Sequence, residues 1–507
     1  MSLRRGRTAP PVFIDWIETY KMKLKLFSLL TVLCLIWMFS ALPAYGQEDG
    51  GEHLYLPVIF RNYDPYSSNR TINVPYTTRF VESAILWFGQ VGPAENYTDV
   101  RVRYTDSELV VDFGVFDRRI WYNGSPSSTP LEDWDAATLL LNTAVNAPQQ
   151  PGNQSYRFVA QFYGLGNGES LPPERKAAYR GTGNGWQGQN IPFVVETGWR
   201  GDGLNNDGDD RGWRITFRIP YTSLGLNRPV EGSRWRMALI SHDRDSRAGP
   251  PGTSFIWPEA AERDAPATWG VLRFGLPSYE PPSVRNLTSL LIREGENGAV
   301  VADAAIGGTI SNQCPGDAFH IWNVWGNRNY ANENSALIQN QADIADWPCF
   351  SKYYLTFPLD RLPPSKVIRS ARLVLHHWGG SGTICTNPDQ NPDPDCARSS
   401  IIQVLTVVNS WQEDTITWNN APLAFENVAM LRVEPYDIGN TNNWPGLRRE
   451  WDVSYALAKA YDQGAVWIGF AVYSADSAYH SGKYFSASET EEWNKIGRPT
   501  LIIEYGD

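Results

Sequence analysis

The chain has 507 residues, enough for two or more domains, with 44 Lys and Arg against 55 Asp and Glu and a formal net charge of −11. This acidic balance argues against binding to DNA, RNA or an anionic membrane surface through charge, and it favours neutral glycans or cations as partners. The 21 tryptophans are unusual. Some suit strand interiors, and others suit a sugar-binding surface, because a pyranose C–H face packs on an aromatic ring.

The N-terminus has the pattern of a secretory signal peptide. A basic stretch at 22–25 precedes an apolar run at 26–39 and the small-residue segment SALPAYG, which ends at Gly46. We expect cleavage there, with an uncleaved membrane anchor as the alternative. Removing residues 1–46 takes away six Lys/Arg and two Asp/Glu, so the net charge falls from −11 to −15. The mature chain is expected to be secreted or held at the cell surface, with no membrane segment.

Residues 47–75 are expected to form a linker. Within them, 53–61 (HLYLPVIFR) resembles a short patch that follows signals in exported proteins of filamentous bacteria. From 76 to 275 apolar and polar residues alternate, as in Trp213-Arg-Ile-Thr-Phe-Arg-Ile219, which predicts half-buried antiparallel strands. Ala136–Thr143 is a borderline helical window.

A proline-rich segment divides the alternating pattern in two. Residues 276–284 (LPSYEPPSV) are expected to be an interdomain linker, and strand-like alternation resumes over 285–507. Val453–Asp462 is the one plausible short helix, and His376 and His377, on adjacent strand positions, should face opposite sides. The fold class is therefore all-β: two β-sandwich, jelly-roll-like domains, at 76–275 and 285–507, joined by a Pro-rich linker.

The cysteines indicate disulfides. One of the five lies in the signal segment, and the four that stay in the mature chain are Cys314, Cys349, Cys385 and Cys396. An even number in an exported chain favours disulfides over metal binding, because no C-x-x-C pair provides zinc-ligand spacing. Three pairings are possible. We favour Cys385–Cys396, which closes its own loop, with Cys314–Cys349 as the other.

The motifs of the first alternating region resemble those of the carbohydrate-binding module family 9-like group, a DOMON-type β-sandwich. They are AILWFG (84–89), a strand ending at Asp117-Arg118, WRITFRIPYTSLGL (213–226), HDRD (242–245) and FIWPEAAERDAPATWGVLRF (255–274). The resemblance implies a sugar held between two tryptophans, but those positions fall near Glu132 and Glu262, neither of which is aromatic. Trp134, two residues from Glu132, is a possible substitute because it faces the same side of an extended chain.

The second region resembles the DNRLRE domain, which is grouped with carbohydrate-binding module family 96. The matching segments are KYYLTFPLDRLPPSKVIRSARLVLHHWG (352–379), SWQEDTITWNNAP (410–422), EWDVS (450–454), WIGFAV (467–472) and FSASE (485–489) followed by RPTL (498–501). The resemblance implies a jelly-roll-like sandwich of a kind found beside enzymes that act on alginate and other matrix polysaccharides. The loop that holds Cys385 and Cys396 is an insertion in this pattern.

Aromatic residues in polar loops are the candidate sugar contacts, since a fixed ring can pack on a sugar face. The candidates are Trp121, Tyr122, Trp134 and Trp186 in the first domain and Trp322 and Trp325 in the second. Simple loop or core packing is the alternative for each of them. Trp186 lies in a glycine-rich loop, GNGWQG, which neither follows a strand nor opens a helix and so predicts no nucleotide site.

An acidic loop is the best candidate for a metal site. In DGLNNDGDD (202–210) the oxygens of Asp202, Asn205, Asp207 and Asp209 could converge on calcium. The alternative is an acidic hairpin turn at the surface. A calcium ion here would be structural, holding the loop rigid.

These observations predict a secreted polysaccharide-binding protein that is not an enzyme, with polysaccharide or a cell-surface glycan as partner. The chain contains none of the common hydrolase, zinc-protease, haem or Walker motifs. One alternative is a structural or adhesive cell-surface protein without a glycan ligand. Another is an accessory part of a matrix-polysaccharide hydrolase or lyase.

Overall fold

The computed structural model describes residues 70–125, 130–144, 146–308, 318–340, 350–407, 411–439, 443–476 and 478–507, with the side chains of 318–320 left out. The predicted signal peptide and most of the first linker lie outside these residues. None of the helices in the described part of the chain has the length and apolar composition of a membrane span.

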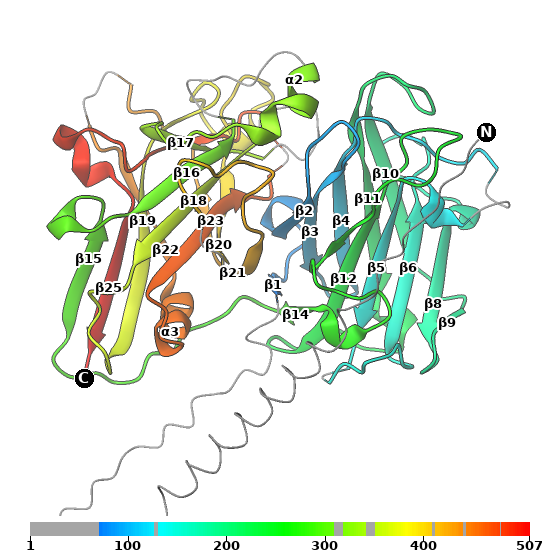
Figure 1. Cartoon of the computed structure of the whole chain (residues 1–507), viewed down its shortest axis with the longest axis horizontal. Helices are drawn as coiled ribbons and strands as arrows, with labels where there is room; N and C mark the ends of the chain where they lie inside the picture. Colours follow the sequence, from blue (N-terminus) through cyan, green and yellow to red (C-terminus); the bar gives the residue numbers. More distant parts are fainter. Residues whose placement is uncertain are drawn as a thin grey trace, which may run out of the picture. The chain divides into compact units, whose positions relative to one another are not determined.

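The first half of the structure is a β-sandwich (Figure 1). One sheet has the order β2 (Ala84–Gly89), β3 (Tyr97–Tyr104), β4 (Glu108–Phe116), β11 (Asp210–Pro220), β10 (Val194–Gly201) and β7 (Glu169–Ser170). The facing sheet has the order β14 (Gly270–Phe274), β12 (Arg234–His242), β5 (Ala136–Asn142), β6 (Ser155–Gln161), β8 (Lys176–Gly181) and β9 (Trp186–Gly188), with β13 (Phe255–Trp257) beside β12.

Apolar and polar residues alternate along strands of this sandwich, and the apolar ones face its core. Trp213, Ile215, Phe217 and Ile219 of β11 are fully buried in the core between the sheets, as predicted. The borderline helical window at 136–143 is strand β5 instead. Leu139, Leu140 and Leu141 are all 0% exposed, so both faces of this strand are covered and period-two alternation disappears from its sequence.

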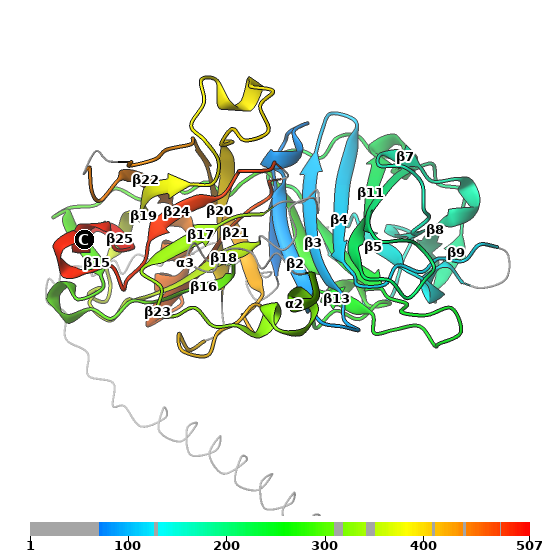
Figure 2. The same cartoon turned by 90° about the horizontal axis from the view of Figure 1, so that it is seen from above.

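The second half is also a β-sandwich (Figure 2). One sheet has the order β16 (Ala302–Gly307), β18 (Ser351–Pro358), β23 (Trp467–Ser474), β20 (Ser400–Val407) and β21 (Ala424–Val433). The other has the order β15 (Thr288–Arg293), β25 (Thr500–Gly506), β19 (Val367–Gly380), β24 (Lys483–Ser486) and β17 (Ser335–Ile338), with β22 (Leu447–Asp452) beside β19. The all-β prediction is therefore confirmed.

Helices are few among the described residues. They are α2 (Ala318–Asn323) and α3 (Ser454–Asp462), the latter as predicted at 453–462. Short 3₁₀ turns lie at Phe80–Glu82, Leu131–Asp133, Pro173–Arg175, Tyr221–Leu224, Pro266–Thr268, Glu296–Gly298, Trp325–Asn327, Pro388–Gln390 and Glu492–Gly497. Residues 275–287 connect β14 to β15 without a regular element.

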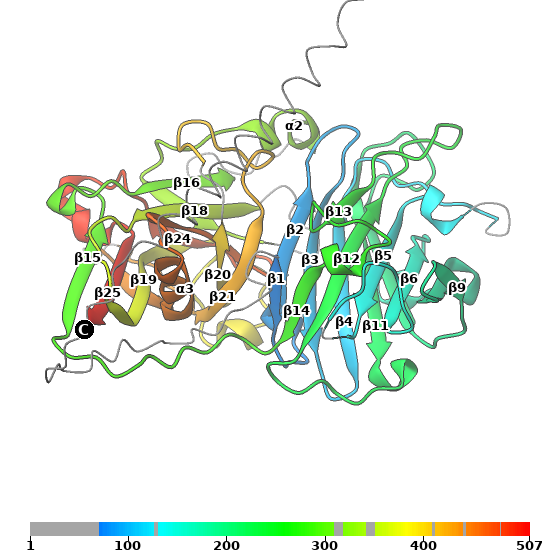
Figure 3. The ribbon, with the colours of Figure 1, turned by 60° about the horizontal axis from the view of Figure 1, so that its bottom comes forward.

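A short strand, β1 (Thr71–Val74), lies within the segment assigned to the first linker and joins the two sandwiches. It pairs in parallel with β14 over its whole length and with β21 at Thr71 and Glu426, so one sheet continues from one sandwich into the other (Figure 3). The side chains of Asn73 and Asn427 extend the second pairing. The Asn73 N–H donates to Asn427 Oδ1 at 2.7 Å, and Asn427 Nδ2 donates to the Asn73 carbonyl at 2.8 Å.

The two sandwiches also share an aromatic cluster. Trp87 and Tyr97 of the first pack against Tyr473 and Trp418 of the second, with ring centroids 5.6 Å and 5.0 Å apart. Asp99 accepts hydrogen bonds from the Tyr97 hydroxyl at 2.6 Å and from the Tyr473 hydroxyl at 2.9 Å. A carboxylate buried at such a junction is stabilised by hydrogen bonds from both sides.

Lys352 lies at the centre of this cluster. Its Nζ is 3.7 Å from the ring centroid of Trp418 and 4.1 Å from that of Trp87, and it donates a hydrogen bond to the Tyr97 hydroxyl. Burial lowers the pKa of Lys352 well below its ordinary value, and the charge of Asp99 opposes that shift. The cluster therefore ties the sandwiches together by ring packing and by buried polar contacts.

Candidate carbohydrate-binding surfaces and cation groups

The candidate aromatic residues of the first sandwich do not form one surface. Trp121 is only 8% exposed, and its backbone N–H donates to Asp135 Oδ2 at 2.6 Å. Tyr122 is half-buried against Tyr163, with ring centroids 5.0 Å apart. The guanidinium of Arg244 lies over the ring of Trp134, 4.3 Å from its centroid. The Trp121 side chain is therefore buried, and the rings of Tyr122 and Trp134 each have a packing partner within the sandwich.

Trp186 lies in strand β9, not in an open loop, and packs over the outer face of the sheet that contains β12. Its ring is parallel to that of buried Trp269, with centroids 6.5 Å apart, and its Nε1–H donates to Asp264 Oδ1 at 2.6 Å. Trp186 is half-buried, so part of the indole still faces solvent.

The position where the resemblance implies a sugar-clamping tryptophan is occupied by a charged network. Glu132 accepts hydrogen bonds from Arg157 and, at 2.6 Å, from Arg263. The Arg157 guanidinium also lies over the Tyr179 ring, 4.7 Å from its centroid. This arrangement offers hydrogen-bonding groups to a ligand, but not the paired flat rings of an aromatic clamp.

Trp322 and Trp325 are buried, at 2% and 1% exposure, in the cluster between the sandwiches. The Trp325 ring packs on Trp418, with centroids 4.7 Å apart. The polar residues around them in the sequence suggested an open loop, but Trp322 lies in α2 and Trp325 in the 3₁₀ turn that follows, and both indoles are buried in the cluster. Neither ring offers a face to a ligand in this conformation.

An exposed aromatic surface lies instead on the outer face of the sheet that contains β19, and we call Trp378, Tyr484, Trp444 and Trp493 the aromatic platform. Trp444 is 39% and Trp493 is 66% exposed. The ring centroids are 5.4 Å apart for Trp378 and Tyr484, 5.8 Å for Trp378 and Trp444, and 5.8 Å for Trp444 and Trp493. A hollow of about 380 Å³ beside Trp444 and Trp493 is also lined by Pro445, Asn494 and Ile496.

Strand register assembles the platform. Phe485 and His377 face each other on the buried side, so the adjacent Tyr484 on β24 and Trp378 on β19 face outward. Trp444 comes from the loop before β22, and Gly446 lets that loop approach β19. Gly446 has φ +92°, and a Cβ there would lie 2.5 Å from the carbonyl oxygen of His377.

Sequence reasoning missed this surface, although a signal was present. Trp444 follows an Asn-rich run (NTNNWPG) and Trp493 lies in a charged one (EEWNK), the same aromatic-in-polar-loop pattern that nominated Trp186. The two lie far apart in the sequence, and only the pairing of β22 and β25 with β19 brings their loops together.

The acidic loop that was the calcium candidate is fastened mainly by hydrogen bonds and an ion pair. Asn205 Oδ1 accepts from the Tyr122 N–H at 2.8 Å, and Asp209 pairs with Arg118 at 2.6 Å. Asp202 and Asp207 are exposed. Among the described residues, the groups of acidic side chains close enough to share a cation do not include Asp202, Asp207 or Asp209. Calcium at this loop stays a prediction.

A different acidic group, Asp117, Asp243 and Asp245, brings carboxylate oxygens within 4.8 Å of one another. Asp117 and Asp243 are 0% and 1% exposed, and Asp243 Oδ2 has no hydrogen-bond partner among the described residues. Burial, followed by the charge of Asp245, raises the pKa of Asp243 to about 8. Like charges buried this closely are stabilised by a bound cation, and oxygen ligands suit calcium.

A second acidic group has its own donors. Asp303, Glu413 and Glu489 also lie within 4.8 Å of one another. Asp303 accepts from the Tyr353 hydroxyl and from Ser488, whose N–H is at 2.8 Å and whose hydroxyl is at 2.9 Å. Burial and Glu489 raise the pKa of Glu413 to about 7.

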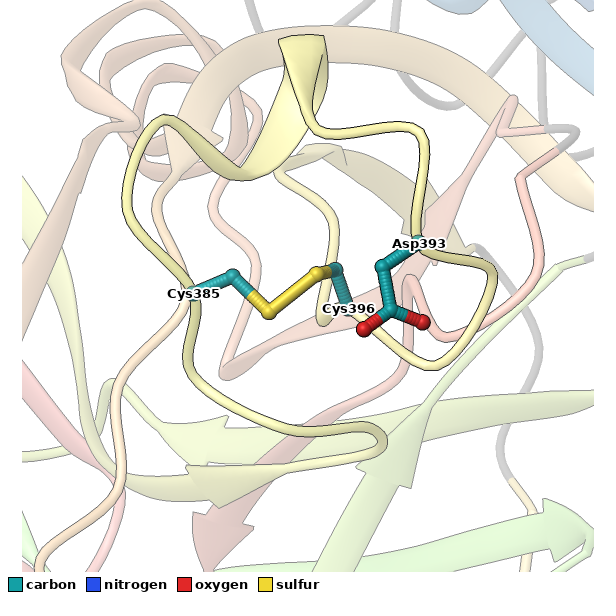
Figure 4. Close-up of side chains that lie close together, drawn as sticks. All are labelled: Cys385, Asp393 and Cys396. Atoms are coloured by element: carbon teal, nitrogen blue, oxygen red, sulfur yellow. A yellow bond between two sulfur atoms is a disulfide. The ribbon is translucent and has the colours of Figure 1, made fainter.

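Cys385 and Cys396 form a disulfide that closes an exposed loop, as predicted (Figure 4). Asp393 lies within the same loop, and its carboxylate is close to the two sulfurs. Because both sulfurs are bonded to each other, this group is not a thiolate metal site. Cys314 and Cys349 lie outside the described residues, so their pairing stays a prediction.

Comparison with known proteins adds family information to this geometry. No curated protein matches the chain. Among solved structures it is similar to a carbohydrate-binding module family 9 module from Caldicellulosiruptor kristjanssonii, in complex with cellotriose (14% identity) and with glucose (13% identity). Each alignment covers 42% of this chain and 100% of the other, at a TM-score of 0.28. Residues 316–505 match the model of carbohydrate-binding module family 96, which confirms the resemblance of the second sandwich to that family.

Proposed function

We propose that this chain is a secreted, non-catalytic polysaccharide-binding protein that holds its ligand on the aromatic platform of the second sandwich. The observation that carries the proposal is the exposure of Trp444 and Trp493 beside a hollow, within the region that matches a carbohydrate-binding family. Large exposed apolar patches mark binding surfaces, because they gain free energy when they are covered.

The binding mechanism is ring packing with polar support. The exposed faces of Trp444 and Trp493 would pack on the C–H faces of sugar rings, while Asn494 at the hollow would hydrogen-bond to hydroxyls. The partly buried ring of Trp378 packs on both Tyr484 and Trp444, and Trp444 packs on Trp493, so that little side-chain entropy is lost on binding.

Three further parts of the proposal rest on separate support. Secretion is supported by the leader pattern at the N-terminus and by the Cys385–Cys396 disulfide. A non-catalytic role is supported by the burial of Asp117, Asp243 and Asp303, because glycoside hydrolysis requires two carboxyl groups about 5 to 10 Å apart across an open cleft. A structural calcium ion would suit the Asp117, Asp243 and Asp245 group.

The test is retention of the mature full chain on insoluble and gel-embedded polysaccharides, with released reducing ends measured in the same samples. Trp493→Ala and Trp444→Ala should each weaken retention about tenfold or more, since central aromatic contacts carry most of a binding surface's energy. Tyr76→Ala, an exposed aromatic on the first sandwich, is the matched control and should leave retention unchanged.

Other results would support the alternatives. Absence of retention on every polysaccharide, together with self-association, would favour a structural or adhesive protein. Release of reducing ends would favour a part in polysaccharide cleavage. Retention that is lost in Trp186→Ala but kept in Trp493→Ala would move the site to the first sandwich.

A further inference from the structure

A second concave site lies on the second sandwich, beside α3. Figure 1 shows α3 at the lower end of this sandwich. A pocket of about 630 Å³, which we call the α3 pocket, opens between the last turn of α3, the loop at 463–466 and the adjoining parts of β20, β21 and β23. Its volume falls within the range of about 300 to 1,000 Å³ that is typical of small-ligand sites.

The walls of the α3 pocket combine aromatic and amide groups. Phe425 of β21 and Trp467 of β23 are half-buried, so each has part of its ring open to the pocket. Gln463, just beyond α3, is exposed at the rim. Gly469 keeps the floor open, because a Cβ there would lie 2.8 Å from Val407 Cγ2 and 3.2 Å from the Trp467 ring.

The charges in the pocket neutralise each other. Lys459 Nζ donates to Glu426 Oε2 at 3.0 Å, and the Glu426 side chain is 4% exposed. Glu426 Oε1 accepts from Asn73 Nδ2 at 3.1 Å. A carboxylate this deeply buried is stabilised only while its partners stay in place, so the ion pair is a fixed part of the wall.

The Lys459–Glu426 ion pair determines which class of ligand the pocket can bind. A charged ligand would have to compete with one member of the ion pair for the other and so weaken the bond that neutralises buried Glu426, which is unfavourable. A pure hydrocarbon would remove water from the ion pair without replacing its hydrogen bonds. A neutral sugar avoids both penalties, because its hydroxyls can accept from Lys459 and hydrogen-bond to the exposed Gln463 amide while its C–H face packs on Phe425 or Trp467.

We propose that the α3 pocket binds a neutral mono- or disaccharide unit, as a second site separate from the aromatic platform. The proposal extends the proposed function, since it assigns a second contact to the same class of ligand. The lining residues of the pocket come from β20, β21, α3, the loop at 463–466 and β23, none of which contributes a side chain to the aromatic platform.

The experiment uses the mature full chain carrying Trp444→Ala and Trp493→Ala, which removes the two exposed platform rings. Soluble glucose, galactose, mannose, xylose and their β-linked disaccharides are titrated by calorimetry, with glucuronic acid and glucosamine as charged comparisons. At least one neutral sugar should bind, and the charged ones should bind about tenfold more weakly. Adding Ala460→Phe, which places a ring in the pocket, should weaken binding about tenfold or more.

A second substitution guards against misfolding. Trp467→Leu removes the ring but keeps the position apolar, and it should also weaken binding, with unchanged circular dichroism as the check on folding. The proposal is overturned if no neutral sugar binds the platform-deficient chain, if charged sugars bind equally well, or if both pocket variants bind as before. If the α3 pocket does not bind sugar but the platform variants lose polysaccharide retention, the proposed function is still supported. Failure of wild-type retention on every polysaccharide overturns the proposed function itself.

Discussion

His377 is held as a neutral imidazole inside the second sandwich. It is 0% exposed, its Nε2 lies 2.8 Å from the Gly379 carbonyl, and an Arg449 nitrogen lies 3.4 Å from its Nδ1. Since a carbonyl only accepts and a guanidinium only donates, Nε2 carries the proton and Nδ1 is the acceptor. Burial, with the charges of Lys483 and Arg449, lowers the pKa of His377 to about 3.

Because the pKa of His377 is lowered in the folded state, the free energy of unfolding should decrease as the pH falls. The unfolded chain takes up a proton at His377 near pH 6.5 and the folded chain only near pH 3, so the unfolded state binds more protons between these values. Stability from this residue is therefore present above pH 6.5 and falls with decreasing pH by up to about 1.4 kcal/mol per unit. Urea unfolding of wild type and His377→Gln between pH 7 and pH 5 should give stability curves that converge towards low pH. Parallel curves would contradict the assignment.

We expect a structural cation to bind at the group formed by Asp117, Asp243 and Asp245. Trp213 donates its Nε1–H to Asp117 at 2.9 Å, so a terbium ion bound in this group would be sensitised by a nearby indole. Terbium luminescence of the full chain should be competed by calcium, and Asp243→Asn should weaken it about tenfold or more, because it removes one charged ligand. Asp207→Asn is the matched control in the exposed loop. The opposite pattern would place the ion in the loop at 202–210.

The exposure of a tryptophan side chain could not be predicted from its neighbours in the sequence. Polar residues surround four tryptophans in the sequence: Trp322, Trp325, Trp444 and Trp493. The first two are buried and the last two are exposed. The difference depends on which partner faces each loop. Trp325 meets Trp418 from a segment far along the chain. His376 and His377 were expected to face opposite sides of their strand. Both are buried, at 6% and 0% exposure, and the backbone at Gly497 contributes to the surroundings of His376.

At the scale of elements, β1 depends on side chains as much as on the backbone. It shares a single paired position with β21, and the Asn73 and Asn427 amides provide the remaining hydrogen bonds between them. Both residues are buried, so their amides have no solvent to replace a lost partner.

Asn427→Ala should therefore destabilise the protein by about 2 to 4 kcal/mol, because it leaves the N–H and the carbonyl of Asn73 buried without that partner. Chemical denaturation of the full chain measures the loss. Asn420→Ala, in an exposed turn of the same sandwich, is the control and should change stability by less than about 1 kcal/mol. Equal effects would mean that the amide pair is not what holds β1.

Elements with a clear period were predictable, and those defined by long-range pairing were not. The apolar face of β11 and the helix α3 follow from local spacing. The strand β5 was ambiguous because both of its faces are buried, and β1 has only four residues, too few for a pattern to stand out. The aromatic platform was missed for the related reason that the pairing of strands distant in the sequence assembles it.

At the scale of the whole molecule, the described residues belong to one compact unit, 65–507, in which the sandwiches share a core. Trp87, Tyr97, Trp418 and Tyr473 would all lose cover if the chain were cut at the proline-rich linker. Buried aromatic surface of this size contributes several kcal/mol.

We expect residues 65–283 and 284–507, produced separately, to bind a hydrophobic dye or aggregate, whereas the full mature chain unfolds in a single transition. Differential scanning calorimetry and dye fluorescence are the measurements. Mixing the halves should reduce the dye signal if the aromatic cluster re-forms. Two soluble halves with native-like spectra and no dye binding would contradict this expectation.

The placement of β1 also fixes an order of events during synthesis. Asn73 leaves the ribosome 354 residues before Asn427, its partner on β21. At about 5 to 20 residues per second, the interval is on the order of 20 to 70 s. During that time the first sandwich can form its own sheets, but the side of β1 that pairs with β21 has no strand to meet. Until β21 has been synthesised, one edge of β1 is therefore unpaired on the nascent chain. We expect the pairing of β1 with β21 to be among the last steps of folding.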